Sequence, residues 1–108
     1  MAGNVTEITD KNFETTVGGS PKLVLIDFWA TWCSPCRAIA PSVEALANEM
    51  SDVLSVGKMD IDHNPNVPAK FGVRSIPTLI LFKGGKPVDQ IVGAQSKDKI
   101  AAMVKKHV

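Results

Sequence analysis

Hydrophobic and polar residues follow one another along the chain in blocks that predict strands and helices in turn. The segment LVLIDFWA, Leu23 to Ala30, is a nearly continuous apolar run, which is typical of a central strand covered on both faces. The segment Lys83-Gly84-Gly85-Lys86 predicts a hairpin turn. Shorter apolar runs predict four further strands, at residues 5–8, 53–61, 78–82 and 88–92.

Two short helices are predicted from the signals at their ends. Asp10 is expected to cap a helix that ends at about Val17. Asn64-Pro65 is expected to begin a second helix that ends at Gly72.

Two longer helices, one after the cysteines and one at the end of the chain, each carry a regular apolar face. Pro41 lies inside the first of these helices and should kink it, and Ser96 is expected to cap the second. The two apolar faces comprise Ile39, Val43, Leu46, Ala47 and Met50, and Ile100, Met103, Val104 and Val108.

The order of these elements predicts the fold class. Strand–helix–strand crossovers in the first half require parallel pairing, and the hairpin in the second half requires antiparallel pairing. We therefore expect a single α/β domain over residues 1–108, with a central mixed five-stranded sheet and helices on both faces. Sites in such folds lie beyond the carboxyl ends of strands, which is where Cys33 follows the strand at residues 23–30.

Composition and charge narrow the range of functions. Hydrophobic residues make up 44% of the chain, charged residues make up 21%, and the formal net charge is +1, which favours neither a nucleic-acid partner nor an anionic membrane. No apolar run approaches the roughly 20 residues that span a bilayer, and the polar N-terminus has no apolar region typical of a secretory signal. We expect a cytoplasmic protein, in which a disulfide is more often catalytic than structural.

Cys33 and Cys36 are the only cysteines, and three uses of the pair are open. A structural staple would close a loop of about four residues and would constrain the unfolded chain little. A structural zinc site needs four ligands, but there is no second CxxC, and His63 and His107 are isolated and expected at the solvated surface. A reversible redox pair fits best, because residues i and i+3 share one face of a helix.

A helix N-terminus would also activate Cys33. Free N–H groups and the helix dipole favour a thiolate there by about 0.3–1 kcal/mol, and by up to about 2 kcal/mol when partly buried. This would lower the thiol pKa by up to about one unit. Pro35 is compatible with the first turn of such a helix.

Five segments together carry a family resemblance: DFWATWCSPC, KMDID, FGVRSIPT, FKGG and VGA. In order and spacing they resemble the thioredoxin family over nearly the whole chain. The resemblance implies a thioredoxin fold and a general protein-disulfide reductase that needs no bound cofactor. It also implies disulfide-containing client proteins, recycling by a thioredoxin reductase, and a monomer. The family usually has Gly-Pro between its cysteines, whereas this chain has Ser34-Pro35, and this departure bears on its reduction potential.

The resemblance further implies a role for each residue near the pair. Cys33 would attack a client disulfide, and Cys36 would resolve the mixed disulfide. Asp27 would take the proton of Cys36; burial inside an apolar strand should raise its pKa, and the alternative is an acid that reaches solvent at the strand end. Lys58 would tune Asp27, and the alternative is a lysine whose stem lies along the surface.

A client-binding surface is implied next to the cysteines. Pro77 matches the cis-proline of the family, and the backbone of Ile76 could pair with an extended client segment. Trp32 is expected to be exposed and Trp29 to lie in the core. The remaining members of this surface are Ser34, Pro35, Gly93 and Ala94.

Two other functions stay open. An oxidase or isomerase would run the same exchange in a more oxidising compartment, and a measured reduction potential separates it from a reductase. A non-catalytic binding module would hold a partner on the apolar rim around Trp32 and Pro77. Such a module would keep its function in a Cys33→Ser, Cys36→Ser double variant.

Overall fold

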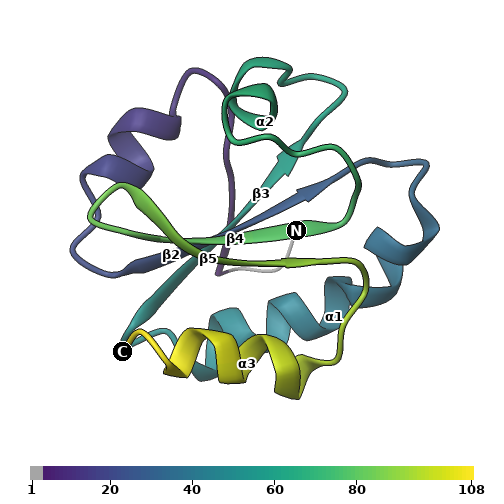
Figure 1. Cartoon of the computed structure of the whole chain (residues 1–108). Helices are drawn as coiled ribbons and strands as arrows, with labels where there is room; N and C mark the ends of the chain where they lie inside the picture. Colours follow the sequence, from purple (N-terminus) through teal and green to yellow (C-terminus); the bar gives the residue numbers. More distant parts are fainter. Residues whose placement is uncertain (1–3) are drawn as a thin grey trace.

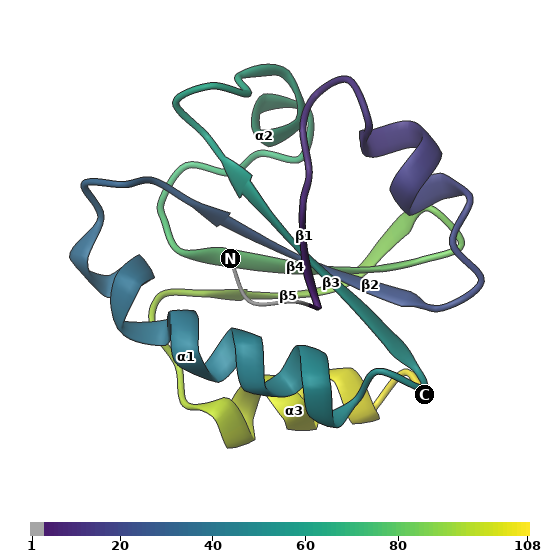
Figure 2. The same cartoon turned by 180° about the vertical axis from the view of Figure 1, so that it is seen from behind.

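The computed structural model of the protein describes residues 4–108; residues 1–3, at the start of the polar N-terminus, lie outside the described part. A sheet forms its middle layer, and helices cover both faces of that sheet (Figures 1 and 2). The elements in chain order are β1 (Val5–Glu7), η1 (a π-helical turn, Glu14–Gly18), β2 (Leu23–Trp29), α1 (Ser34–Glu49), β3 (Leu54–Asp60), α2 (Asn66–Lys70), β4 (Thr78–Lys83), β5 (Lys86–Val92) and α3 (Lys97–Lys105).

The strand order β1-β3-β2-β4-β5 confirms the mixed five-stranded sheet. Strand β3 runs parallel to β1 and β2, whereas β4 is antiparallel to β2 and β5 is antiparallel to β4. Helices α1 and α3 lie together on one face, and η1 and α2 lie on the other (Figures 1 and 2). Because β2 and β3 are parallel, the segments that follow them emerge at the same edge of the sheet, and one of these segments carries the cysteines.

The caps predicted for the two short helices were wrong, because Asp10 and Asn64 act across the fold. The carboxylate of Asp10 accepts the N–H groups of Asn66 and Val67, at 3.0 and 2.9 Å, and thereby caps α2 instead of its own segment. The side chain of Asn64 accepts the Asp10 N–H at 2.9 Å and donates to the Asp60 carbonyl at 3.0 Å. These contacts join the N-terminal segment to the start of α2.

Other side chains cap the remaining ends. Thr9 and Asn12 bond each other's backbone N–H groups, at 3.1 and 2.8 Å, and form the turn before η1. The helical segment there is therefore shorter than predicted. Ser96 accepts the Lys99 N–H at 3.2 Å, which confirms its predicted role as the cap of α3.

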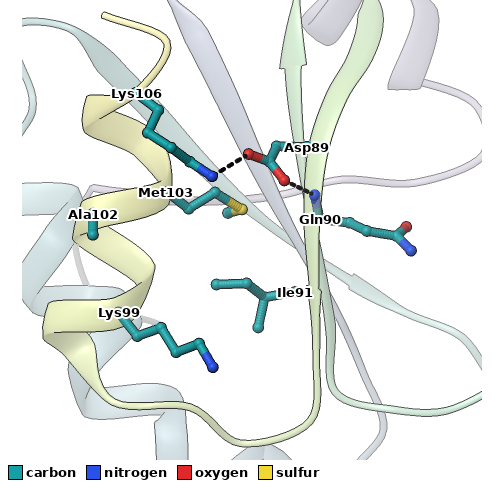
Figure 3. Close-up of a pocket in the computed structure, with 7 residues that line it drawn as sticks. All are labelled: Asp89, Gln90, Ile91, Lys99, Ala102, Met103 and Lys106. Carbon is teal, nitrogen blue, oxygen red and sulfur yellow. Dashed lines mark hydrogen bonds and ion pairs between the residues drawn. The ribbon is translucent and has the colours of Figure 1, made fainter.

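The end of α3 is fixed to β5 by Asp89 (Figure 3). Its Oδ2 lies 3.3 Å from Lys106 Nζ, and its Oδ1 accepts the Gln90 N–H at 2.9 Å. The same Oδ2 also lies 2.9 Å from His107 Nε2, which the figure does not draw. The side chain of His63 is 81% exposed, as expected, whereas that of His107 is 26% exposed and so only partly solvated. The predicted place of Val108 on the apolar face was also wrong, because α3 ends three residues earlier and this side chain is 69% exposed.

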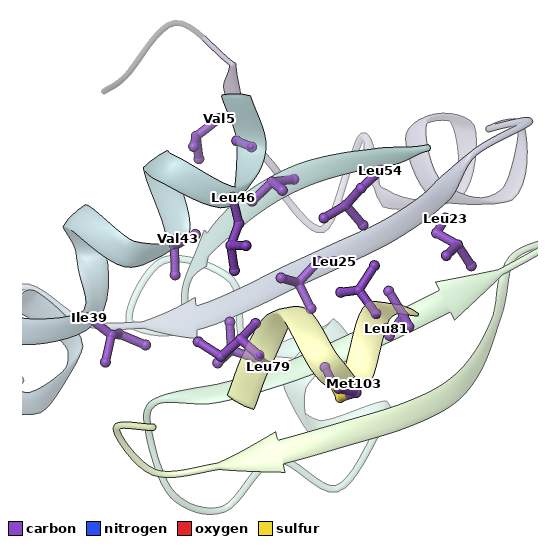
Figure 4. Packing of buried hydrophobic residues seen from close by; sticks show 14 residues of the cluster. Val5, Leu23, Leu25, Ile39, Val43, Leu46, Leu54, Leu79, Leu81 and Met103 are labelled. Atoms are coloured by element: carbon purple, nitrogen blue, oxygen red, sulfur yellow. The ribbon is translucent and has the colours of Figure 1, made fainter. Parts of the chain in front are cut away.

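Buried apolar side chains fill both faces of the sheet. Strand residues pack against Ile39 and Met103 on the face that α1 and α3 cover (Figure 4). On the opposite face the rings of Phe13, Phe71 and Phe82 meet with centroids 5.2–5.6 Å apart. Both faces of the central strand are thus covered, as its unbroken apolar run predicted.

Candidate functional site

The two cysteines lie where β2 is followed by α1, and they form a disulfide with their Cα atoms 5.3 Å apart. Cys33 is the N-cap of α1, and its Sγ accepts the Cys36 N–H at 3.2 Å. The predicted position of Cys33 at a helix N-terminus is therefore confirmed. Both cysteines are buried, whereas Ser34 and Pro35 in the first turn of α1 are exposed.

Two polar contacts hold the segment just before Cys33. Trp32 is 65% exposed, as expected, and its indole Nε1 donates to Asp62 Oδ2 at 2.9 Å. Arg37 Nη1 donates to the carbonyl of Thr31 at 2.8 Å. Sequence reasoning missed both residues: Asp62 lies thirty positions from Trp32, and Arg37, although it follows Cys36, looks like an ordinary surface charge.

A second segment reaches the disulfide from the start of β4. The Ile76–Pro77 peptide bond is cis, as the family resemblance implied. Ile76 packs against the buried cluster of Ala30, Cys33 and Cys36, and the carbonyl of Pro77 accepts the Gly93 N–H at 2.8 Å. Gly93 has a φ of +90°, a conformation that glycine adopts without strain, and Ala94 beside it is exposed. The structure thus brings these residues together at one edge of the sheet.

Asp27 lies on the sheet face that α1 covers, because side chains alternate along β2 and Leu25 points to that face. Its neighbours across the sheet are Lys58 in β3 and Leu79 in β4. Asp27 is fully buried, and within residues 4–108 neither of its carboxyl oxygens has a hydrogen-bond partner. Burial raises the pKa of Asp27 to about 6, and the charge of Lys58 acts in the opposite direction. The alternative of a solvated acid is wrong.

Lys58, the neighbour of Asp27 in β3, lies beside Trp29. Its Nζ is 4.8 Å from the centroid of the Trp29 ring, which is within the range of a cation–π contact. Glu7 and Asp60 line the same cavity, whose volume is about 180 Å³. Trp29 packs against the buried cluster of Ala30, Cys33 and Cys36, but it is only partly buried and also lines this cavity, so it lies at the edge of the core and not inside it as predicted.

Other parts of the described chain offer less chemistry. A cavity of about 410 Å³ between β5 and α3 is lined by none of the predicted site residues (Figure 3). No helix within residues 4–108 is long and apolar enough to cross a membrane. The side chains in that range also form no group of three or more His, Cys, Asp or Glu residues able to hold a metal ion.

Comparison with known proteins agrees with the family resemblance described above, over nearly the whole chain. Residues 4–106 match the family model described as Thioredoxin. The thioredoxin of Chlorobaculum thiosulfatiphilum is 47% identical over 107 residues, which cover 99% of each chain. That of Staphylococcus haemolyticus is 48% identical over 104 residues, which cover 96% of this chain and 98% of the other. A bifunctional thioredoxin reductase/thioredoxin of Mycobacterium leprae is 52% identical over 96 residues, which cover 89% of this chain and 21% of that longer protein.

Proposed function

The chain belongs to the thioredoxin family and is a protein-disulfide reductase, and from this premise we propose how its residues divide the reaction. The observation that carries the proposal is the Cys33–Cys36 disulfide, which is closed at the N-terminus of α1. That helix covers the sheet face on which Asp27 is buried. A nucleophile, a resolving thiol and a proton acceptor are therefore supplied by adjoining elements.

In the first step the Cys33 thiolate of the reduced protein attacks one sulfur of a client disulfide. A bond forms between Cys33 and the client, the client disulfide breaks, and the departing client sulfur takes up a proton. The N-terminus of α1 favours the attacking thiolate by about 0.3–1 kcal/mol, and by up to about 2 kcal/mol at a partly buried site. The thiol pKa then lies nearer to neutral pH, where attack is efficient.

In the second step Cys36 gives its proton to Asp27 and attacks the sulfur of Cys33. The Cys33–Cys36 disulfide forms, the mixed disulfide breaks, and the client leaves with both electrons of the pair. A pKa of about 6 lets Asp27 accept and release protons close to neutral pH, and the charge of Lys58 tunes that pKa.

Clients would dock on the surface beside the disulfide. The backbone of Ile76 is placed to pair with an extended client segment, and Pro77 beside it donates no backbone hydrogen bond. Exposed Trp32 supplies apolar area next to the attacking sulfur. The other proposed contact residues are Ser34, Pro35, Gly93 and Ala94.

We place the protein in the cytoplasm as a monomer that carries electrons from a thioredoxin reductase to its clients, with residues 1–108 as a single domain. Support for a reductase partner comes from the Mycobacterium leprae relative, whose name joins both activities in one protein. The near-neutral net charge supports the absence of nucleic-acid and anionic-membrane partners.

Trapping of clients tests the division of roles. Cys36→Ser should accumulate mixed disulfides on Cys33, because attack proceeds and resolution does not. The matched variant Cys33→Ser should trap almost none, since Cys36 lies inside the first turn of α1 and lacks the N-cap position that favours a thiolate at Cys33. Non-reducing electrophoresis and mass spectrometry of the trapped species measure both. If the Cys36→Ser variant reduced disulfides at the wild-type rate, the two-step mechanism would be wrong.

A further inference from the structure

The sheet face that α1 covers changes from apolar to charged at its carboxyl end. The pairing of β1, β3 and β2 places Glu7, Lys58 and Asp27 in one row across the sheet. The next row pairs Asp60 with Trp29. Side chains two apart on a strand share a face, so all five lie on this face. Lys58 is therefore surrounded on this face by the carboxyl groups of Glu7, Asp27 and Asp60 and by the indole of Trp29.

Lys58 pairs with the indole and not with the acids. In the described part of the chain it forms no ion pair, although Asp27 and Glu7 flank it in register on both sides. Its ammonium lies over the Trp29 ring. The carboxylate of Asp60 is occupied by His63, whose Nδ1 lies 3.0 Å away.

We propose that Trp29 is a positioning residue: its ring holds the Lys58 ammonium out of ion-pair contact with Asp27, which leaves Asp27 free to exchange protons. The inference rests on the proposed role of Asp27 as the base that serves Cys36. An ammonium in direct contact would stabilise the carboxylate and make it a poorer proton acceptor. An ammonium held at a distance still lowers the free energy needed to ionise buried Asp27, but it does not lower the pKa so far that the carboxylate stops accepting protons.

The remaining neighbours of Asp27 do not carry charge. Helix α1 packs Cys36, Ile39 and Val43 toward this region, and β4 places Leu79 opposite Asp27. Glu7 and Asp60 are the other ionisable groups that line the Lys58 cavity. Burial has the largest effect on the pKa of Asp27, and Lys58 supplies the opposing charge, so the position of its ammonium sets how strongly that charge acts.

The test is a double-mutant cycle on the titration of Asp27. The pKa of its carboxyl group is measured by ¹³C NMR in the oxidised protein, for Trp29→Leu alone, Lys58→Met alone and both together. Removing the ring should let Lys58 approach Asp27 and lower the pKa of Asp27 by about half a unit to one unit. In the Lys58→Met background, Trp29→Leu can change the pKa of Asp27 only by letting water closer to the carboxyl group. It should therefore lower that pKa by less.

Trp29→Phe supplies a milder pair of variants in case the leucine side chain prevents folding. Phenylalanine keeps a ring face, so it should preserve most of the wild-type pKa of Asp27 in the presence of Lys58. Ring removal that lowers the pKa of Asp27 equally with and without Lys58 would overturn the inference, because the ring would then act only by excluding water. A phenylalanine variant that shifts as far as the leucine variant would overturn it as well.

These measurements need no client and no reductase, so they are independent of the proposed function. The pH profile of client reduction by the same variants then tests the role of Asp27. A profile that does not follow the measured pKa of Asp27 would refute Asp27 as the base and leave the positioning by Trp29 intact.

Discussion

Replacing Asp27 by asparagine should stabilise the oxidised protein in a pH-dependent way. The pKa of Asp27 is about 6 in the folded chain, against an ordinary value of 3.8. Between about pH 4 and pH 6 the folded chain keeps a proton that the unfolded chain has released, so the free energy of unfolding falls as the pH rises. The difference of about 2 pKa units corresponds to about 3 kcal/mol, which is fully lost above pH 6.

Asparagine removes this titration and keeps the shape of the side chain. The stability difference between Asp27→Asn and the wild type should therefore grow by about 2.5 kcal/mol from pH 4 to pH 7, because the unfolded chain is already partly ionised at pH 4. The amide and the protonated acid contribute a difference in packing free energy that does not change with pH. The increase of the stability difference with pH therefore measures only the free-energy cost of the buried charge. Urea denaturation of both oxidised proteins at several pH values measures it.

Asp52→Asn is the matched control, because Asp52 is exposed and its charge stays in water in the folded and unfolded chains. Its stability difference from the wild type should stay flat over the same range. A flat difference for Asp27→Asn would refute the reasoning, since it would mean that water reaches the Asp27 carboxylate in the folded protein.

Two further substitutions test other parts of the structure. Ser34→Gly should lower the reduction potential by at most a few tens of millivolts and raise the Cys33 thiol pKa slightly, because glycine lacks the hydroxyl that can bond the thiolate. Equilibration with glutathione and titration of thiolate absorbance measure these effects, and a rise in potential would contradict this role of the Ser34 hydroxyl. Asp10→Ala should cost about 1 kcal/mol in urea denaturation, because the first N–H groups of α2 lose their acceptor. Lys11→Ala, at an exposed neighbour, should cost much less, and equal losses would show that the cap does not stabilise α2.

Patterns confined to one segment predicted the fold well. The apolar run at residues 23–30 identified the buried central strand, and Ser96 identified the start of α3, because burial and capping depend on neighbouring positions in the sequence. Asp10 and Asn64 were misassigned because their partners lie more than fifty residues away or in another element. The sequence shows which side chains can cap a helix, but not which helix end the fold brings to them.

In the candidate site, too, features set by neighbouring positions could be predicted and contacts between distant segments could not. The spacing of Cys33 and Cys36 favoured a redox pair, whereas the apolar surroundings of Asp27 left a solvated acid at the strand end as an open alternative. Trp29 could not be placed, because its neighbours Lys58 and Asp60 come from a strand thirty residues later, and only the register of the sheet decides that they meet. Electrostatic partners across a sheet therefore require the structure.

The position of β3 has a consequence for the order in which the chain can fold during synthesis. Among the described strands β1 pairs only with β3, and Val5 lies opposite Val56, about fifty residues further along the chain. At about 5–20 residues per second, β1 leaves the ribosome several seconds before that partner exists. Strand β3 must then enter between two strands that were both made earlier, whereas the β4–β5 hairpin can close locally as it emerges. The half of the sheet that carries Asp27 and leads into the cysteines therefore stays incomplete until its middle strand arrives, and the hairpin is added to it afterwards.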